Sequence, residues 1–311
     1  MKAVDDGMRY RSRMSNRFVP LAAGEPIGVV ALSGPVDRDR LDEGLRVLET
    51  WGHPVVLAPN LRTRSGYLAG DDDARLAGLD AVVAQGASLL LAARGGYGVT
   101  RLLPRLALGE LAAAGVRFVG YSDISALLNA LAAAGGAPQV HGPMVAAGLA
   151  RRDNELRLRR LLAGELIGES LFRFDSRRVV RPGQAAGPAI GGTMSVMAAL
   201  IGTPHEPRWE GSVLFLEDVD EPLYRLDRLL THLRSSGRLR DVKALISGSL
   251  RGCGSIAERA ERWREMVVAA APAEVPVVVG LPFGHAARNL AFPIGAAVEV
   301  DTASGTIRWS E

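Results

Sequence analysis

Short, almost wholly apolar runs alternate with amphipathic segments through the first half of the chain. The apolar runs are IGVVAL, PVVLA, SLLLAA and RFVGY. Between them, residues 38–52 and 72–86 carry apolar side chains at helical spacing, and each segment ends in glycine, a common helix stop. Strands that alternate with helices form a parallel sheet with crossover helices, and strands this apolar are buried on both faces. We therefore predict a parallel α/β sheet over about residues 27–140.

The pattern changes after residue 150. Residues 151–165 are typical of a charged helix, and residues 179–188 contain two prolines and two glycines, which indicates an irregular connection. Helix and strand patterns return from residue 189 and end in short strands. We predict an α/β protein with a loose N-terminal extension at 1–20, an N-terminal parallel α/β domain at 21–150, a connecting segment at 151–188 and a smaller β-rich α/β C-terminal domain at 189–311.

Composition and charge limit the partners. Of the 311 residues, 48% are hydrophobic and 23% charged, the mix typical of a globular protein. The net charge is only +3 and the arginines are spread along the chain, so we expect no nucleic-acid partner. Gly24, Glu25 and Pro26 interrupt the first apolar stretch, so we expect no membrane partner. Cys253 is the single cysteine, so the chain cannot form an internal disulfide, which favours a cytoplasmic protein. No Cys/His spacing suits a zinc site.

Ser122 lies in GYSDISALL, between an apolar strand run and an apolar helix pattern. A serine in this place is a common helix N-cap, because its side-chain oxygen accepts from free N–H groups of the first turn. A serine on a sharp strand-to-helix turn is also suited to nucleophilic attack, since backbone N–H donors lie beside it. The local pattern leaves both interpretations open. If Ser122 is the nucleophile, Asp123 is left to cap the helix.

A glycine-rich segment, ARGGYGVTRLL, follows the run SLLLAA. Such a loop lets backbone approach a ligand closely, with N–H groups aimed at an anion or a carbonyl oxygen. The segment does not match a dinucleotide fingerprint, because Arg101 stands where the third glycine belongs. A tight turn shaped by glycine is the plainer alternative.

An acidic cluster begins at Glu217, where the apolar strand SVLFLE ends. Ligands bind at the carboxyl ends of strands in open α/β sheets, which makes Glu217 a candidate site residue. The alternatives are a solvated acidic loop and a hard-cation site formed with Asp218, Asp220 and Glu221. The cluster lacks the alternating ligands and central glycine of a calcium loop, so we expect no metal.

His285 lies in a glycine-flanked loop, GLPFGHAARN, after the run VPVVVG. A histidine on such a loop is well placed to move protons. His141, at the end of another strand run, is a rival for this role. A serine nucleophile needs an adjacent base and an acid that orients the base, and the chain offers these residue types in the order Ser, Glu, His. The residues alone therefore make a Ser–His–Glu hydrolase a hypothesis.

Six blocks between residues 27 and 301 resemble, in order, the LD-carboxypeptidase family of serine peptidases, which includes muramoyltetrapeptide carboxypeptidase and the microcin C immunity peptidases. The blocks are ARGGYGVTRLL, GYSDISALL, HGPM, GGTMSVMAALIGTP, LFLEDVDEPLYRLDRLLTHL and LPFGHAARNLAFPIG. Each block is modest alone, whereas six in series form a specific match.

The resemblance implies a role for each candidate residue. Ser122 would be the nucleophile, His285 the general base and acid, and Glu217 the residue that orients His285. Backbone N–H groups of Asp123 and of Gly95 or Gly96 would form the oxyanion hole. The resemblance also implies an active site between two domains, no metal or organic cofactor, and a homodimer.

The implied reaction releases a C-terminal D-amino acid, typically D-alanine, from a cytoplasmic murein tetrapeptide by cleaving an amide after an L-configured centre. Two features of this sequence depart from patterns expected in relatives. Thr193 stands in GGTM where many relatives carry Asn, and residues 175–190 contain no aromatic side chain to stack on a nucleobase. The first feature puts in doubt any substrate contact assigned to the side chain at position 193. The second favours murein peptides over microcin C-like peptidyl or aminoacyl nucleotides. A non-catalytic peptide-binding protein is the alternative from another class.

Overall fold

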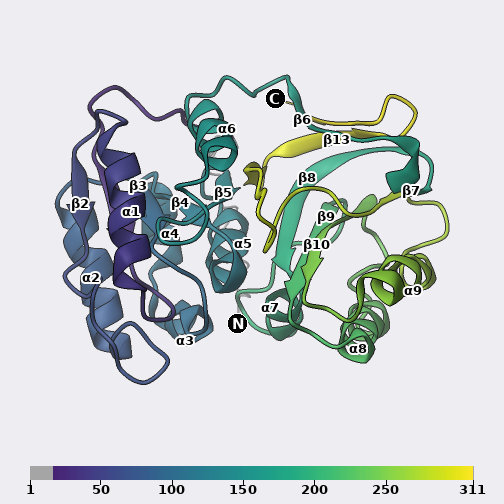
Figure 1. Ribbon diagram of the computed structural model, residues 1–311, viewed down its shortest axis with the longest axis horizontal. Coiled ribbons are helices and arrows are strands. Elements are labelled where there is room, and N and C mark those ends of the chain that lie inside the picture. Colours follow the sequence, from purple (N-terminus) through teal and green to yellow (C-terminus); the bar gives the residue numbers. More distant parts are fainter. Residues whose placement is uncertain (1–16, 311) are drawn as a thin grey trace, which may run out of the picture.

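The first sheet of the computed structural model, which describes residues 17–310, is the predicted parallel α/β sheet (Figure 1). Its strand order is β12-β5-β4-β3-β1-β2, with β12 (Phe292–Ile294) coming from the C-terminal half, and all neighbours are parallel except β12 and β5. Every residue of β1, β3 and β4 is buried, which confirms a sheet covered on both faces. The strands of the N-terminal half are β1 (Ile27–Val30), β2 (Val55–Leu57), β3 (Leu89–Ala92), β4 (Arg117–Gly120) and β5 (Gln139–His141).

Helices connect these strands, and the sequence sets where they begin. Asp37 and Asp71 precede the two long helices and accept hydrogen bonds from Arg40 N and Ala74 N at 3.0 and 2.8 Å, as N-caps do. The helices of this half are α1 (Arg38–Glu49), α2 (Asp72–Ala84), α3 (Val99–Leu102), η1 (Leu103–Arg105), α4 (Leu108–Ala113), η2 (Ser122–Ile124) and α5 (Ser125–Ala133).

The second sheet has eight strands in the order β6-β14-β13-β8-β9-β10-β11-β7. Strands β8 to β11 run parallel to one another, while the remaining pairs are antiparallel, so this half is β-rich and mixed. Its elements are α6 (Arg152–Leu162), β6 (Ser170–Arg173), η3 (Ser176–Arg178), β7 (Val179–Arg181), β8 (Gln184–Thr193), α7 (Met194–Ala199), β9 (Val213–Val219), α8 (Leu223–Ser235), β10 (Ala244–Arg251), α9 (Ile256–Ala270), β11 (Val277–Val278), β13 (Ala297–Asp301) and β14 (Thr306–Trp309). The predicted fold class is confirmed.

Two segments differ from the expectation. Residues 179–188, expected to be irregular, form β7 and the first half of β8, because β8 pairs with β13 from Gln184 to Pro188. Residues 292–294, expected within a loop, form β12 and pair antiparallel with β5. The C-terminal half thus supplies the edge strand of the N-terminal sheet.

The two halves share one hydrophobic core. Buried side chains from both sheets form a single cluster, and a second cluster fills the space among α7, α8, α9 and the second sheet. The helical spacing of Leu226, Leu229, Leu230 and Leu233 predicts one apolar stripe on α8. Three of them are buried in that second cluster, and Leu229 is only partly buried against it. In Figure 1, α5 lies between the sheets. No helix within residues 17–310 is long and apolar enough to cross a bilayer.

Candidate active site

Ser122 stands on a strained turn directly after β4. Its φ is 63°, and within residues 17–310 only Asp220 shares a positive φ among the non-glycine residues. A side chain held in this region costs about 1–3 kcal/mol and is typical of functional turns. Tyr121 occupies the N-cap position of η2, and no side chain caps this turn by a hydrogen bond. The turn therefore presents Ser122 without using its hydroxyl as a cap.

The glycine loop lies directly against Ser122. A Cβ added to Gly95 would stand 2.6 Å from Ser122 Cβ and 2.8 Å from Ser122 Oγ, so only glycine fits. Gly96 adopts a φ of 121°, which L side chains rarely adopt, and packs on Gly34. Gly34 N also donates to Gly95 O at 3.1 Å. The loop thus brings backbone to the face of Ser122 where an oxyanion hole would lie.

Asp123 ties the serine turn to the glycine loop. Its Oδ2 accepts from Ser33 Oγ at 2.6 Å and from Val99 N, the first residue of α3, at 2.9 Å. Burial raises the pKa of Asp123, although these two hydrogen bonds and the charge of Arg75 oppose the rise. The capping role considered for Asp123 therefore goes to α3, which follows the glycine loop, and not to the helix after Ser122.

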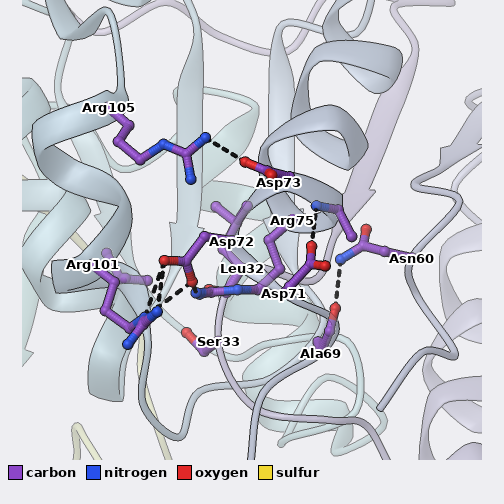
Figure 2. Close-up of polar contacts among 12 residues, drawn as sticks. Leu32, Ser33, Asn60, Ala69, Asp71, Asp72, Asp73, Arg75, Arg101 and Arg105 are labelled. Carbon is purple, nitrogen blue, oxygen red and sulfur yellow. Dashed lines mark hydrogen bonds and ion pairs between the residues drawn. The ribbon is translucent and has the colours of Figure 1, made fainter. Parts of the chain in front are cut away.

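A network of ion pairs lies against the end of the same loop (Figure 2). Arg75 is completely buried, contacts Leu32 O, and donates to Asp72 at 2.5 Å. Arg101 of α3 binds the same carboxylate, with its closest contact at 2.8 Å, and this hydrogen bond lowers the pKa of Asp72 to about 2. A Cβ on Gly98 would lie 2.5 Å from the guanidinium of Arg75. The network therefore fixes both α3 and the end of the glycine loop.

Glu217 and His285 are in direct contact. Glu217 belongs to the parallel strand β9, is fully buried, and its Oε2 lies 2.7 Å from His285 Nδ1 and accepts from His285 N at 3.0 Å. Thr193 Oγ1 donates to the other oxygen, Oε1, at 2.5 Å. Burial raises the pKa of Glu217, but the hydrogen bonds from His285 and Thr193 and the nearby imidazoles outweigh it and bring the pKa below its usual value. An ionised Glu217 holds the His285 ring with Nδ1 inward and Nε2 outward.

Tyr121 links the histidine to the serine turn. Its ring centroid lies 4.9 Å from that of His285, in an edge-on arrangement, and the next residue is Ser122. No hydrogen bond joins Ser122 Oγ to His285 in the described chain. In unliganded enzymes such a contact is often long and tightens only when substrate binds. The structure thus brings Glu217 and His285 into contact, and Ser122 follows the tyrosine that packs on His285.

His141, the rival base, is fully buried among aromatic side chains. Its ring stacks on Phe292 at 4.7 Å, and neither ring nitrogen has a hydrogen-bond partner. Burial, together with the charge of His285, lowers its pKa to about 4 and outweighs the opposing effect of Glu217. A neutral imidazole enclosed by apolar rings has no path to a substrate, so His285 is the better placed base.

The acidic cluster does not converge on one point. Asp218 turns away from Glu217 and accepts from Ser195 N at the start of α7, at 2.9 Å. Glu221 lies 3.0 Å from Arg225 of α8. Within residues 17–310 no group of three or more His, Cys, Asp or Glu side chains is placed to hold a metal ion.

Thr193 and Ser33 are site residues that the sequence did not single out as such. Thr193 ends β8, the strand next to β9, and its register partner is Glu217. Ser33 follows the first strand run and reaches Asp123. The sequence could have indicated both residues by their position. Each stands at or just after the end of a buried parallel strand, the edge of the sheet where ligands bind.

Comparison with known proteins identifies the family. The N-terminal domain of the LD-carboxypeptidase family matches residues 27–142, and its C-terminal domain matches residues 186–300. The chain belongs to the LD-carboxypeptidase family. It is therefore a serine-type carboxypeptidase by membership, as the resemblance implied. The chain is also 36% identical over 305 residues to the murein tetrapeptide carboxypeptidase of Pseudomonas aeruginosa, covering 91% of this chain and 94% of that protein.

Solved structures share the LD-carboxypeptidase fold. The muramoyltetrapeptide carboxypeptidase from Oxalobacter formigenes superimposes with a TM-score of 0.77 at 29% identity, covering 91% of this chain and 97% of that one. The microcin C7 self-immunity protein MccF in its apo state gives a TM-score of 0.85 at 21% identity, covering 95% and 98%. At that identity the second likeness speaks for the fold alone.

Proposed function

We propose that this LD-carboxypeptidase releases the C-terminal D-amino acid, D-alanine, from a murein tetrapeptide by hydrolysing an L,D-amide bond. The observation that carries the proposal is the contact between buried Glu217 and partly buried His285, together with the strained Ser122 turn, whose preceding residue Tyr121 packs on His285. The relatives named for murein peptides support this substrate class. We also expect a cytoplasmic homodimer, which sedimentation and cell fractionation would test.

In the proposed mechanism Ser122 Oγ attacks the scissile carbonyl carbon and gives its proton to His285 Nε2. Glu217 stabilises the resulting imidazolium and keeps the tautomer that accepts at Nε2. Backbone N–H groups of Asp123 and of Gly95 or Gly96 stabilise the oxyanion, and one such donor is typically worth on the order of 100-fold in rate.

Breakdown of the tetrahedral intermediate requires His285 to give up the proton that it took from Ser122. His285 donates it to the departing amine as the C–N bond breaks, which releases the D-amino acid and leaves an ester on Ser122. His285 then takes a proton from water as the water attacks the ester, and returns it to Ser122 as the ester bond breaks. No step calls for a metal or an organic cofactor.

The test measures D-alanine release from a murein tetrapeptide by the wild-type protein and by Ser122→Ala. Release by the wild type and its loss in the variant support the proposal, and labelling of Ser122 by a serine-directed phosphonate separates an enzyme from a binding protein. A peptidyl sulfamoyl adenylate provides the competing substrate. Its preferred cleavage would overturn the murein assignment, for which the absence of aromatic residues in 175–190 speaks.

A further inference from the structure

A charged pocket adjoins the Glu217–His285 pair. It has a volume of about 660 Å³ and is lined by His285, Tyr121 and the loops at residues 145–151 and 285–287. Its charged lining residues are Arg40, Glu43, Arg151 and Arg251. Three guanidinium groups face one carboxylate here, so the pocket carries a net positive charge and favours an anionic group.

Arg251 has a fixed backbone and an unpaired side chain. It ends β10, its register partner on β9 is Val219, and its carbonyl oxygen accepts from Asp220 N at 2.8 Å. The side chain is exposed, and among the described residues it forms no ion pair and no side-chain hydrogen bond. Its guanidinium is therefore free to bind a ligand.

The charge of Arg251 acts on Tyr121, which packs on His285. Burial raises the pKa of Tyr121 to about 12, and the charge of Glu217 adds to the rise while that of Arg251 opposes it. Tyr121 in turn packs on His285 with ring centroids 4.9 Å apart. Arg40 and Arg151 line the same pocket without such an effect on Tyr121, and Arg40 stands one helical turn from Glu43 on α1, which offsets its charge.

The chemistry of a carboxypeptidase places a carboxylate in this pocket. His285 must come within about 3 Å of the departing nitrogen to protonate it. In a C-terminal residue the carboxylate carbon is only two covalent bonds from that nitrogen, about 2.5 Å away. The terminal carboxylate therefore falls close to His285. The planar guanidinium fork matches a carboxylate with two parallel hydrogen bonds.

We propose that Arg251 binds the C-terminal carboxylate of the peptide and so restricts cleavage to the chain end. This inference rests on the proposed function and adds the residue that recognises the free acid. It also explains how the serine nucleophile avoids internal amide bonds, because only a terminal residue carries an anion two covalent bonds from the departing nitrogen, within the pocket that His285 and Arg251 share.

The test compares two murein tetrapeptides that end in D-alanine and in D-alaninamide, with release of the last residue as the readout. We expect Arg251→Met to lower kcat/KM for the acid by roughly 10–100-fold, the worth of a charge-assisted hydrogen bond, chiefly through KM. The kcat/KM of the variant for the amide peptide should change little. Arg251→Lys should recover part of the activity on the acid, because it restores the charge without the fork.

Arg40→Met is the matched control, since it removes a guanidinium from the same pocket. An equal loss on acid and amide in Arg251→Met, or an acid-specific loss in Arg40→Met or Arg151→Met in its place, would overturn the role of Arg251. Failure of the wild-type enzyme to release the last residue from either peptide would instead overturn the proposed function, and the inference with it.

Discussion

At the scale of single residues, Thr193 decides how firmly Glu217 is held. Its hydroxyl is the partner of Glu217 Oε1 in a fully buried site, at 2.5 Å. Thr193→Val keeps the shape of the side chain and leaves that oxygen without this donor, which costs about 1–3 kcal/mol of stability. Because the donor favours the ionised carboxylate, its loss also raises the pKa of Glu217, and the acid limb of the pH profile of kcat/KM should move to higher pH.

We expect Thr193→Val to lower kcat/KM about tenfold at neutral pH, equivalent to one hydrogen bond of about 1.4 kcal/mol. Thr193→Ser should restore both rate and pH profile, because it retains the hydroxyl. Thr203→Val is the control. It removes a hydroxyl that lies away from the site and donates to Leu200 O at 2.7 Å. An unchanged pH profile in Thr193→Val would show that the threonine only fills space.

Asp218 makes stability depend on pH. Burial raises its pKa to about 6, although hydrogen bonds from Val219 N and Ser195 N oppose the rise. The unfolded chain loses this proton near pH 3.9, so between about pH 4 and 6 the native state binds more protons than the unfolded state. The free energy of unfolding therefore falls as pH rises through that window, by about 3 kcal/mol at most.

Asp218→Asn should remove that slope. An amide cannot accept all the hydrogen bonds of the carboxylate, so the variant loses stability by a constant amount at every pH, and the slope is the quantity to compare. Urea unfolding of both proteins at pH 4.5, 5.5 and 7 measures how the free energy of unfolding changes with pH. Parallel curves for the two proteins would contradict the assignment.

At the scale of elements, the loop between β3 and α3 decides whether Ser122 can react. An alanine at position 95 would place its Cβ 2.6 Å from Ser122 Cβ, so either the loop or the serine turn must move. We expect Gly95→Ala to lower kcat on the order of 100-fold, the effect of losing one oxyanion donor, while the fold persists. D-alanine release and circular dichroism measure the two effects.

Gly109→Ala is the matched control, because Gly109 lies on the exposed side of α4 with nothing within 4 Å of an added Cβ. It should keep full activity and gain up to about 1 kcal/mol of stability from the better helix propensity of alanine. Full activity in Gly95→Ala would remove the loop from the site.

Strands whose local sequence is wholly apolar could be predicted. Strands that form only because they pair with residues far away in the sequence could not. The runs that became β1, β3 and β4 are apolar at every residue because both faces are covered, which a sequence displays directly. Strand β12 contains only three residues and exists because they pair with β5 about 150 positions earlier. The first half of β8 is rich in Ala and Gly and carries Pro188, so nothing local announces a strand until β13 lies beside it.

The same distinction applies to the site. Ser122, Glu217 and His285 could be proposed from the sequence because each ends or follows an apolar run, where strand ends present side chains. The roles of Thr193 and Arg251 depend on which residues they contact or approach across strands far apart in the sequence, and no spacing encodes that. The domain boundaries at residues 21, 151 and 189 stay a prediction, and the structure places three strands of the second sheet wholly or partly within 151–188.

At the scale of the whole molecule, the proposed site requires the two sheets to hold a fixed position relative to each other. Ser122 precedes α5 in the first half, and Glu217 lies on β9 in the second. Asn129 of α5 connects them, since its Nδ2 donates to Gly191 O of β8 at 2.8 Å and its Oδ1 accepts from Gly191 N at 2.9 Å. Asn129 is buried, so water cannot replace these bonds.

We expect Asn129→Ala to leave both backbone groups of Gly191 buried without this partner, which lowers the free energy of unfolding by about 2–5 kcal/mol. It should also lower kcat/KM under conditions where the protein stays folded, because α5 is no longer held to β8. Gln139→Ala is the control: Gln139 is equally buried and accepts from Phe118 N at 2.7 Å, within the first half and at the opposite end of β5 from His141. It should lose stability and keep its activity. Equal kcat/KM in the two variants would show that the halves hold their geometry without Asn129, and the shared core, including the pairing of β12 with β5, would then be what fixes the site.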